Sequence, residues 1–334
     1  MTQNSTSEPT FRDTASDNHD SVSDPRPVPG VVGGDPGQTA TLPPSHPLRR
    51  PLAEGGTDGA PLLRRLRGER PDAPPSVWFM RQAGRSLPEY RALREGTTML
   101  DSCVRPEMAA EITLQPVRRH DVDAGIFFSD IVVPARQAGL AVEIQPGVGP
   151  VFEHPIRTEA DVDALPPLGD AYEESLEPIR EAVQLTVAEL GSTPLVGFAG
   201  APFTVASYMV EGGPSRDHLR TRALMRSQPE VWARLAAWVA ELSGRFLRAQ
   251  VLAGASSVQL FDSWVGALSE EMYLGHVQQH SSAVFGQVAD LPVSRTHFGV
   301  GAAHLLPQMW EAGATAMGID HRLRLDHALE ILPA

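Results

Sequence analysis

The sequence predicts a (β/α)8 barrel, and three observations favour this fold. From residue 76 onward, short apolar segments alternate with longer amphipathic ones. The short segments are rich in β-formers and bounded by Gly, Pro or Asp, as expected of buried parallel strands. Polar residues recur where these segments end, which is where the active sites of such barrels lie. A doubly wound open sheet is the other architecture compatible with this alternation.

Six segments qualify as strands, and right-handed crossovers would place them in one parallel sheet with the helices outside. A closed barrel needs eight strands, so we expect a barrel that is truncated after the sixth strand. Residues 140–155 alternate around a Pro-Gly turn, which predicts a β-hairpin. Kinks or breaks are expected at Pro116 and Pro307. The predicted strands are 76–80, 124–131, 194–201, 256–263, 293–299 and 314–320, and the predicted helices are 106–119, 171–190, 229–254, 269–286 and 301–313.

The first 72 residues have a different composition from the rest of the chain. They are rich in Pro and Gly and show neither helical nor strand periodicity. Such a segment buries too little apolar surface to offset its ordering entropy, so we expect residues 1–72 to be a disordered extension. A short helical turn is expected within residues 61–70. Residues 73–334 are then the barrel domain, and removal of residues 1–70 is expected to leave stability unchanged.

Composition excludes several classes of protein. The formal net charge of −13 argues against a nucleic-acid binder, because no positive field would attract phosphates. No run of 18 apolar residues and no secretory signal is present, which favours a cytoplasmic protein without a membrane span. A single cysteine, Cys103, cannot form an internal disulfide or build a thiolate zinc site. All 28 basic residues are arginine, which excludes a Schiff-base or P-loop lysine.

The densest group of candidate functional residues lies in 77–94, VWFMRQAGRSLPEYRALR. Arg81 and Arg85 follow a predicted strand, while Arg91 and Arg94 lie three apart on a predicted helix. Planar guanidinium groups are suited to bind carboxylates or phosphates. The alternative for Arg91 and Arg94 is a solvated, salt-bridged helix face.

Further polar residues occur at other predicted strand ends. Asp130 could accept N–H groups or stabilise a cation, or it could be a turn or N-cap aspartate. Ser263 follows its strand as a hydrogen-bonding group, and Tyr208 lies downstream of another strand, either with its hydroxyl at the same mouth or as a core residue. Gly197 and Gly200 suit close approach of a ligand or tight strand-to-helix packing. The strand ends predicted to converge on one mouth carry Arg81, Asp130, Ser263, His297 and Asp320.

Five motifs resemble the uroporphyrinogen decarboxylase family in order and spacing: MRQAGRSLPEYR, FSDI, GFAGAPFTVASYMVEGG, QLFDSW and HFGVG. The resemblance covers residues 72–334. It implies a (β/α)8 barrel, a homodimer, and cofactor-free removal of the four acetate carboxylates of uroporphyrinogen III to give coproporphyrinogen III. The family usually has tyrosine where Ser86 stands, and its QGNLDP-like and NLGHG-like motifs have no counterpart here.

The resemblance also implies roles for individual residues. The substrate is a polycarboxylate, so the segment Arg81 to Arg85 would line the pocket, with the two arginines engaging carboxylates. Asp130 would accept the pyrrole N–H groups, and Arg81 is the candidate proton donor. Protonation of a pyrrole carbon makes the ring an electron sink for loss of CO2, so no cofactor is expected. The residues implied to bind substrate are Arg81, Gln82, Ala83, Gly84, Arg85, Asp130, Tyr208 and Ser263.

Two alternatives remain open at this point. One is a truncated, non-catalytic fragment that at most binds a tetrapyrrole. The other is a cobalamin or coenzyme M methyltransferase of the same superfamily. Such enzymes hold zinc through cysteine and histidine, and the single cysteine and the absence of an H-x-C pattern count against this alternative.

Overall fold

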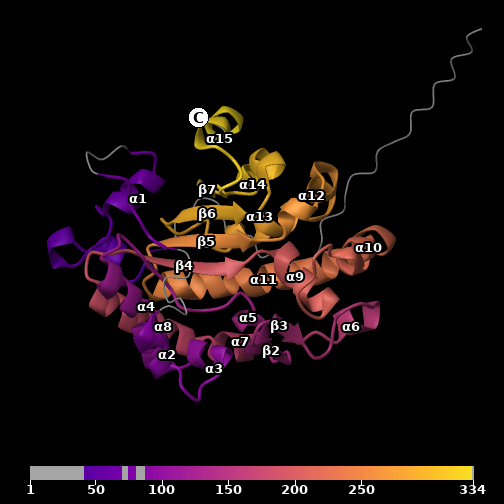
Figure 1. Ribbon diagram of the computed structural model, residues 1–334, viewed down its shortest axis with the longest axis horizontal. Coiled ribbons are helices and arrows are strands. Elements are labelled where there is room, and N and C mark those ends of the chain that lie inside the picture. The colour runs from indigo at the N-terminus through magenta and orange to yellow at the C-terminus, as the bar shows by residue number, and fades with distance from the viewer. Residues whose placement is uncertain (1–40, 70–73, 80–86, 333–334) are drawn as a thin grey trace, which may run out of the picture. The chain divides into compact units, whose positions relative to one another are not determined.

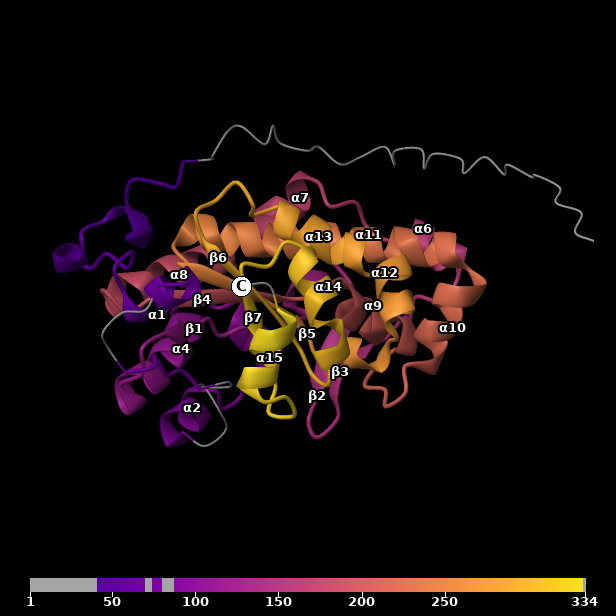
Figure 2. The same cartoon turned by 90° about the horizontal axis from the view of Figure 1, so that it is seen from above.

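The computed structural model describes residues 41–69, 74–79 and 87–332. Its main sheet has five parallel strands in the order β1-β4-β5-β6-β7 (Figure 1 and Figure 2). Neighbouring strands of the sheet follow one another along the chain apart from an inserted hairpin, as successive βα units require. The strands are β1 (Gly125–Ile126), β4 (Leu195–Gly200), β5 (Ser257–Asp262), β6 (Ser294–Gly299) and β7 (Ala316–Gly318), and the hairpin is β2 (Val142–Gln145) with β3 (Gly149–Phe152).

Helices separate the strands and form the layer that packs against the sheet (Figure 2). The longest, α11, packs against β4 and β5. The α-helices are α1 (Pro61–Leu66), α2 (Pro88–Leu93), α3 (Met99–Cys103), α4 (Pro106–His120), α5 (Val133–Gln137), α6 (Glu159–Asp163), α7 (Asp170–Ser175), α8 (Glu177–Leu190), α9 (Pro202–Glu211), α10 (Leu219–Ser227), α11 (Pro229–Ala253), α12 (Glu270–His276), α13 (Gln278–Gly286), α14 (Leu306–Glu311) and α15 (Leu325–Ile331). Short 3-10 turns are η1 (Pro47–Arg49), η2 (Leu52–Glu54), η3 (Val265–Ala267) and η4 (Ala303–Leu305).

Five of the six predicted strands are confirmed, and the predicted strand at 76–80 is wrong over its described residues. There, the Asp123 backbone N–H donates to the Val77 carbonyl at 2.8 Å, and the Asp123 carboxylate accepts the Val77 N–H at 2.6 Å. These two bonds do not make a strand ladder. Val77 and Phe79 are about half exposed, so the apolar pattern at this position does not mark a buried strand.

The predicted helices are confirmed in position, but three of them are interrupted. The segment 171–190 forms α7 and α8, because Pro178 starts a new helix in its first turn. The segment 269–286 forms α12 and α13. Pro116 lies inside the continuous helix α4. Pro307 lies in the first turn of α14, which follows a 3-10 turn, so only Pro307 marks a break. The hairpin at 140–155 is confirmed.

The two faces of the main sheet differ. One face is covered by helices, and its residues Val258, Leu260 and Asp262 are completely buried. Phe261 and Phe298 lie on the opposite face, side by side in register, and both are partly exposed. Alternation along each strand therefore separates a helix-packed face from a face, here called the open face, on which side chains are partly exposed.

A closed eight-stranded barrel is not seen among the described residues. Their parallel sheet has two end strands, β1 and β7, which do not pair with each other. The coarser prediction, a barrel-like α/β fold built on a parallel sheet, is confirmed. No helix of the described residues is long and apolar enough to cross a membrane.

Residues 41–69 do not fit the expected disordered extension, because they fold and pack against the domain. His46 is 2% exposed, and its ring Nε2 lies 2.9 Å from the Val251 carbonyl at the end of α11. The Thr57 hydroxyl lies 2.8 Å from that of Ser256, just before β5. Leu42 and Leu63 are also buried, and α1 confirms the predicted helical turn. Residues 1–40 lie outside the described part of the chain.

Acidification is expected to loosen this segment through His46. Its Nδ1 accepts the Leu48 N–H and its Nε2 donates to Val251, so the ring is held neutral, and burial lowers its pKa. The unfolded state therefore takes up the proton more readily, and stability is lost as pH falls below about 6.5. Thermal unfolding measured across this range checks the expectation. His46→Gln should weaken the pH dependence, whereas His154→Gln, at an exposed histidine, should leave it unchanged.

Candidate active site

Asp130 lies in the loop that follows β1, at the carboxyl edge of the sheet. Its Oδ1 accepts the backbone N–H of Val132 at 3.1 Å, and its carbonyl accepts that of Val133. The aspartate thus forms the turn that sequence analysis considered as an alternative. The same bond orients the half-buried carboxylate at the strand end. Cys103 is buried close by: burial, with the Asp130 charge as a second cause, raises the pKa of its thiol well above the usual value.

Gly200 is the contact point between the Asp130 loop and the next strand. A Cβ built on Gly200 would lie 2.8 Å from Ile131 Cβ and 2.5 Å from Val205 Cγ2. A Cβ on Gly197 would similarly meet Gln250 of α11. Both glycines therefore serve tight packing within the fold, which confirms the structural alternative for the pair. The packing of Gly200 sets the position of the loop that carries Asp130.

Gly200→Ala is expected to destabilise the protein by about 1–3 kcal/mol, because the added methyl group overpacks this contact. Displacement of Ile131 should also shift the neighbouring aspartate and reduce catalytic efficiency. Calorimetry and steady-state assays measure the two effects. Gly275→Ala is the matched control, since nothing lies within 4 Å of the added Cβ in that exposed helical position. Equal stability of Gly200→Ala and Gly275→Ala would contradict the packing role of Gly200.

Trp264 connects Tyr208 to the chain segment that carries Ser263. The Trp264 indole stacks on the Tyr208 ring with 4.0 Å between centroids and on the His218 ring with 4.4 Å. The backbone N–H of Trp264 donates to the Thr204 hydroxyl at 3.2 Å, which ties the end of β5 to α9. Ser263 lies between this anchored residue and β5. His218 adopts a left-handed conformation with φ of 49°, and burial lowers the pKa of its ring.

A row of three phenylalanines on the open face was missed by sequence analysis. Phe198, Phe261 and Phe298 come from β4, β5 and β6, and neighbouring rings meet edge to face with centroids 5.4 and 5.8 Å apart. Such a row provides an apolar wall for a ring-shaped ligand. The signal was present in the sequence, since each phenylalanine lies near the carboxyl end of its predicted strand.

The arginine group of the candidate site is only partly described. Arg81 and Arg85, together with Gln82, Ala83 and Gly84, lie outside the described residues. Arg94 donates to the Tyr90 hydroxyl at 2.5 Å and to Ser102 Oγ at 3.2 Å, so its guanidinium has structural partners. Arg91 is exposed on α2. For Arg94 the structure favours the structural alternative.

Two other predicted mouth residues have different surroundings from those expected. His297 does not face the mouth: it is paired in register with Leu260, points to the helix-covered face and is completely buried. Asp320 binds the Gly301 N–H at 2.7 Å and the Arg322 guanidinium at 2.8 Å. Although burial opposes the shift, these bonds lower the pKa of Asp320. Its bonds join the loops after β6 and β7.

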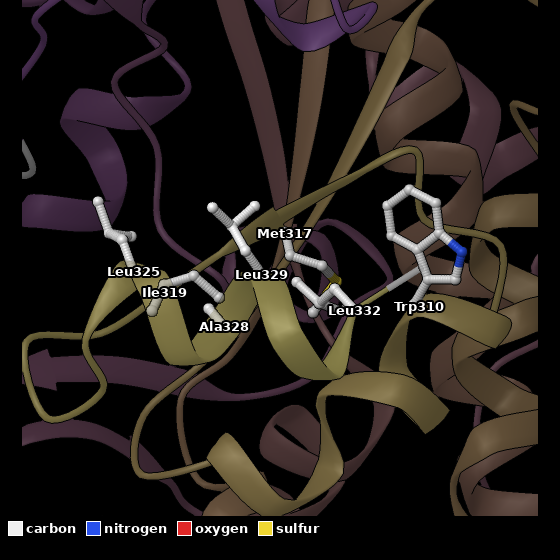
Figure 3. A pocket seen from close by; sticks show the side chains of 7 residues that line it. All are labelled: Trp310, Met317, Ile319, Leu325, Ala328, Leu329 and Leu332. Carbon is white, nitrogen blue, oxygen red and sulfur yellow. The ribbon is translucent and has the colours of Figure 1, made fainter. Parts of the chain in front are cut away.

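A groove of about 330 Å³ lies beside β7 and α15 (Figure 3). Its side chains are predominantly apolar and include no carboxylate, guanidinium or imidazole, so it does not offer the groups that bind a polyanion or move a proton. We therefore do not assign the groove to the candidate active site. Its lining consists of Trp310, Met317, Ile319, Leu325, Ala328, Leu329 and Leu332.

Comparisons with known proteins agree with this geometry. A family model described as uroporphyrinogen decarboxylase matches residues 57–333. The uroporphyrinogen decarboxylase of Leifsonia xyli is 58% identical over 305 residues, which are 86% of this chain and 80% of that protein. That of Streptomyces avermitilis is 58% identical over 252 residues, 75% of this chain and 70% of that protein.

Among solved structures, a methyltransferase from Methanosarcina mazei matches with a TM-score of 0.63 at 16% identity, covering 78% of this chain and 75% of that one. This likeness concerns the fold alone.

The parallel sheet, its one-sided layer of helices and the polar residues at its carboxyl edge define a barrel-like α/β enzyme. The family model covers most of the chain and begins within the segment at 41–69 that the structure shows to be folded. The chain belongs to the uroporphyrinogen decarboxylase family.

Proposed function

We propose that this chain removes the four acetate carboxylates of uroporphyrinogen III and releases coproporphyrinogen III, as a carboxy-lyase of porphyrin and haem biosynthesis. The observation that carries this proposal is the 58% identity to a uroporphyrinogen decarboxylase over 80% of its length. The site supports it with a half-buried carboxylate, an aromatic wall and a stacked tyrosine at one edge of the sheet.

Asp130 is proposed to accept the pyrrole N–H groups and to stabilise the cationic ring formed when a pyrrole carbon is protonated. Its turn through Val132 supports this role by presenting the carboxylate in a set orientation. At about 4 Å and an effective dielectric of about 20, a carboxylate and a cation attract by about 4 kcal/mol. This stabilisation acts on charge that develops during the reaction, so it lowers the barrier.

Arg81 and Arg85 are proposed to bind substrate carboxylates, with Gln82, Ala83 and Gly84 lining the pocket, and Arg81 is the candidate proton donor. Tyr208 and Ser263 are proposed to contact substrate side chains. Their connection through Trp264 supports a shared site for these two residues. The protonated ring takes the electron pair left by CO2, so we expect no cofactor.

The same proposal extends to the architecture and the assembly. The consecutive order of the parallel strands supports a (β/α)8 barrel. A cytoplasmic homodimer is proposed from the family resemblance, with the tetrapyrrole as the small-molecule partner and no nucleic-acid or membrane partner. The domain boundary is better placed before residue 57 than at residue 73, since the family model starts there.

Anaerobic incubation of the purified chain with uroporphyrinogen III tests the proposed function. We expect stepwise loss of CO2 and accumulation of coproporphyrinogen, separated by chromatography after oxidation. Folded protein that leaves the substrate unchanged would overturn the proposal. Binding of the tetrapyrrole without turnover would instead support a non-catalytic binding protein.

A further inference from the structure

A group of polar side chains is buried behind the strand ends, on the helix-covered face of the sheet. Asp262 ends β5 and His297 lies in the neighbouring strand β6, and both side chains are 0% exposed. Among the described residues, Asp262 Oδ2 and His297 Nε2 have no hydrogen-bond partner, although they lie 3.8 Å apart. Thr204, Tyr273 and Ser281 complete this buried group.

The hydrogen bonds determine where one proton of His297 lies. His297 Nδ1 is 3.1 Å from the Met309 carbonyl oxygen, which can only accept, so Nδ1 carries a hydrogen. A neutral ring would then direct the lone pair of Nε2 toward Asp262. On the other side of Asp262, the Thr204 hydroxyl donates to Oδ1 at 2.8 Å, because an ionised carboxylate can only accept. Thr204 Oγ in turn accepts the Trp264 N–H.

Among the described residues, His297 is the only group that forms an ion pair with Asp262. Asp262 makes no ion pair with an arginine in the part of the chain that the structure describes. Tyr273 from α12 is kept neutral, because burial and then the Asp262 charge raise its pKa. The ring of Phe285 from α13 meets the His297 ring edge to face at 5.4 Å. A buried carboxylate with a single neutral donor is costly, and a lone pair directed at it adds repulsion.

We propose that His297 carries a proton on both ring nitrogens in the folded protein, forms an ion pair with Asp262, and acts as a positioning residue for Ser263 and Trp264. The second proton, on Nε2, replaces the repulsion between the lone pair and the carboxylate with the attraction of an ion pair at 3.8 Å. The role in substrate positioning rests on the proposed function of the site, whereas the protonation of His297 does not.

The route from this pair to the site is short. Asp262 directly precedes Ser263, and the Thr204 hydroxyl that binds Asp262 also binds the Trp264 backbone. Ser263 is therefore held on both sides, and the Trp264 indole stacks on Tyr208. The pair itself does not reach the open face. Its loss should therefore weaken substrate binding more than it slows the chemical step.

Ring ¹⁵N NMR of the full chain labelled at histidine tests the protonation directly. At about pH 8, where a free imidazole is neutral, we expect both His297 nitrogens to be protonated. His297→Gln assigns the signal by its disappearance. His280 provides an internal control: burial lowers its pKa to about 4, so its ring should carry one proton. A singly protonated His297 would overturn the proposal.

Asp262→Asn provides a second test, which does not depend on whether His297→Gln folds. This change should convert His297 to the singly protonated form and raise KM for uroporphyrinogen about tenfold with kcat within about twofold. A His297 signal unchanged in Asp262→Asn would overturn the ion pair, and a fall in kcat with KM unchanged would overturn the positioning role. If the unmodified chain showed no turnover, the proposed function would fail while the NMR result still decided the protonation.

Discussion

Asp130→Asn is expected to lower kcat for uroporphyrinogen decarboxylation by about 100- to 1,000-fold. The substitution keeps the size of the side chain and leaves an oxygen that can still accept the Val132 N–H, so the turn after β1 should persist. What it removes is the negative charge that we propose stabilises the cationic ring. Steady-state assays with uroporphyrinogen III measure the loss of kcat. Thermal unfolding checks that stability is unchanged.

Asp121→Asn is the matched control for this charge change. Asp121 lies at the end of α4, before β1 and therefore at the opposite edge of the sheet from Asp130. It has a φ of 49°, a left-handed conformation that asparagine also tolerates. The kcat of Asp121→Asn should equal that of the unmodified chain. Near-normal turnover in Asp130→Asn would contradict the proposed role of Asp130.

Deletion of residues 1–70 is expected to destabilise the domain by several kcal/mol, contrary to the expectation from sequence alone. The deletion removes Leu42 and Leu63, each worth about 1.5–3 kcal/mol when fully buried. It also leaves the Val251 carbonyl and the Ser256 hydroxyl without the partners they have in His46 and Thr57. Since domains are stable by about 5–15 kcal/mol, chemical denaturation should show a large shift.

A point substitution in the same segment separates this effect from gross truncation. Leu63→Ala should cost about 2–5 kcal/mol, because the side chain is 2% exposed. Leu52→Ala makes the same chemical change at a position that is 54% exposed, and it should be nearly neutral. Indistinguishable midpoints for the two variants would show that residues 41–69 do not stabilise the domain.

The hydrophobic pattern was sufficient to predict most strands and helices of the domain, because a buried parallel strand is a continuous run of apolar residues. It failed for residues 41–69, where the burial depends on partners remote in the chain. His46 and Val251 are 205 positions apart, and Thr57 and Ser256 are 199 positions apart. No local periodicity reports such contacts. The apolar residues at 77–79 gave the opposite error, since a local pattern does not guarantee a neighbouring strand.

The candidate site was also predicted only in part. The ends of parallel strands predicted which loops would meet, and this places Asp130 and Ser263 at one edge of the sheet. The orientation of His297 was missed because the face on which a strand residue lies depends on register, here the pairing of His297 with Leu260. A polar residue on the helix-covered face is explained only once its partner, Asp262, is known.

The stack of Trp264 between Tyr208 and His218 has a spectroscopic consequence. An indole held at the rim of a tetrapyrrole site should transfer its excitation energy to an oxidised porphyrin bound nearby, so its fluorescence should be quenched on binding. Titration of Trp264→Phe beside the unmodified chain would isolate this emission from that of the other four tryptophans. Quenching of Trp264 would then report occupancy of the proposed site without an added dye.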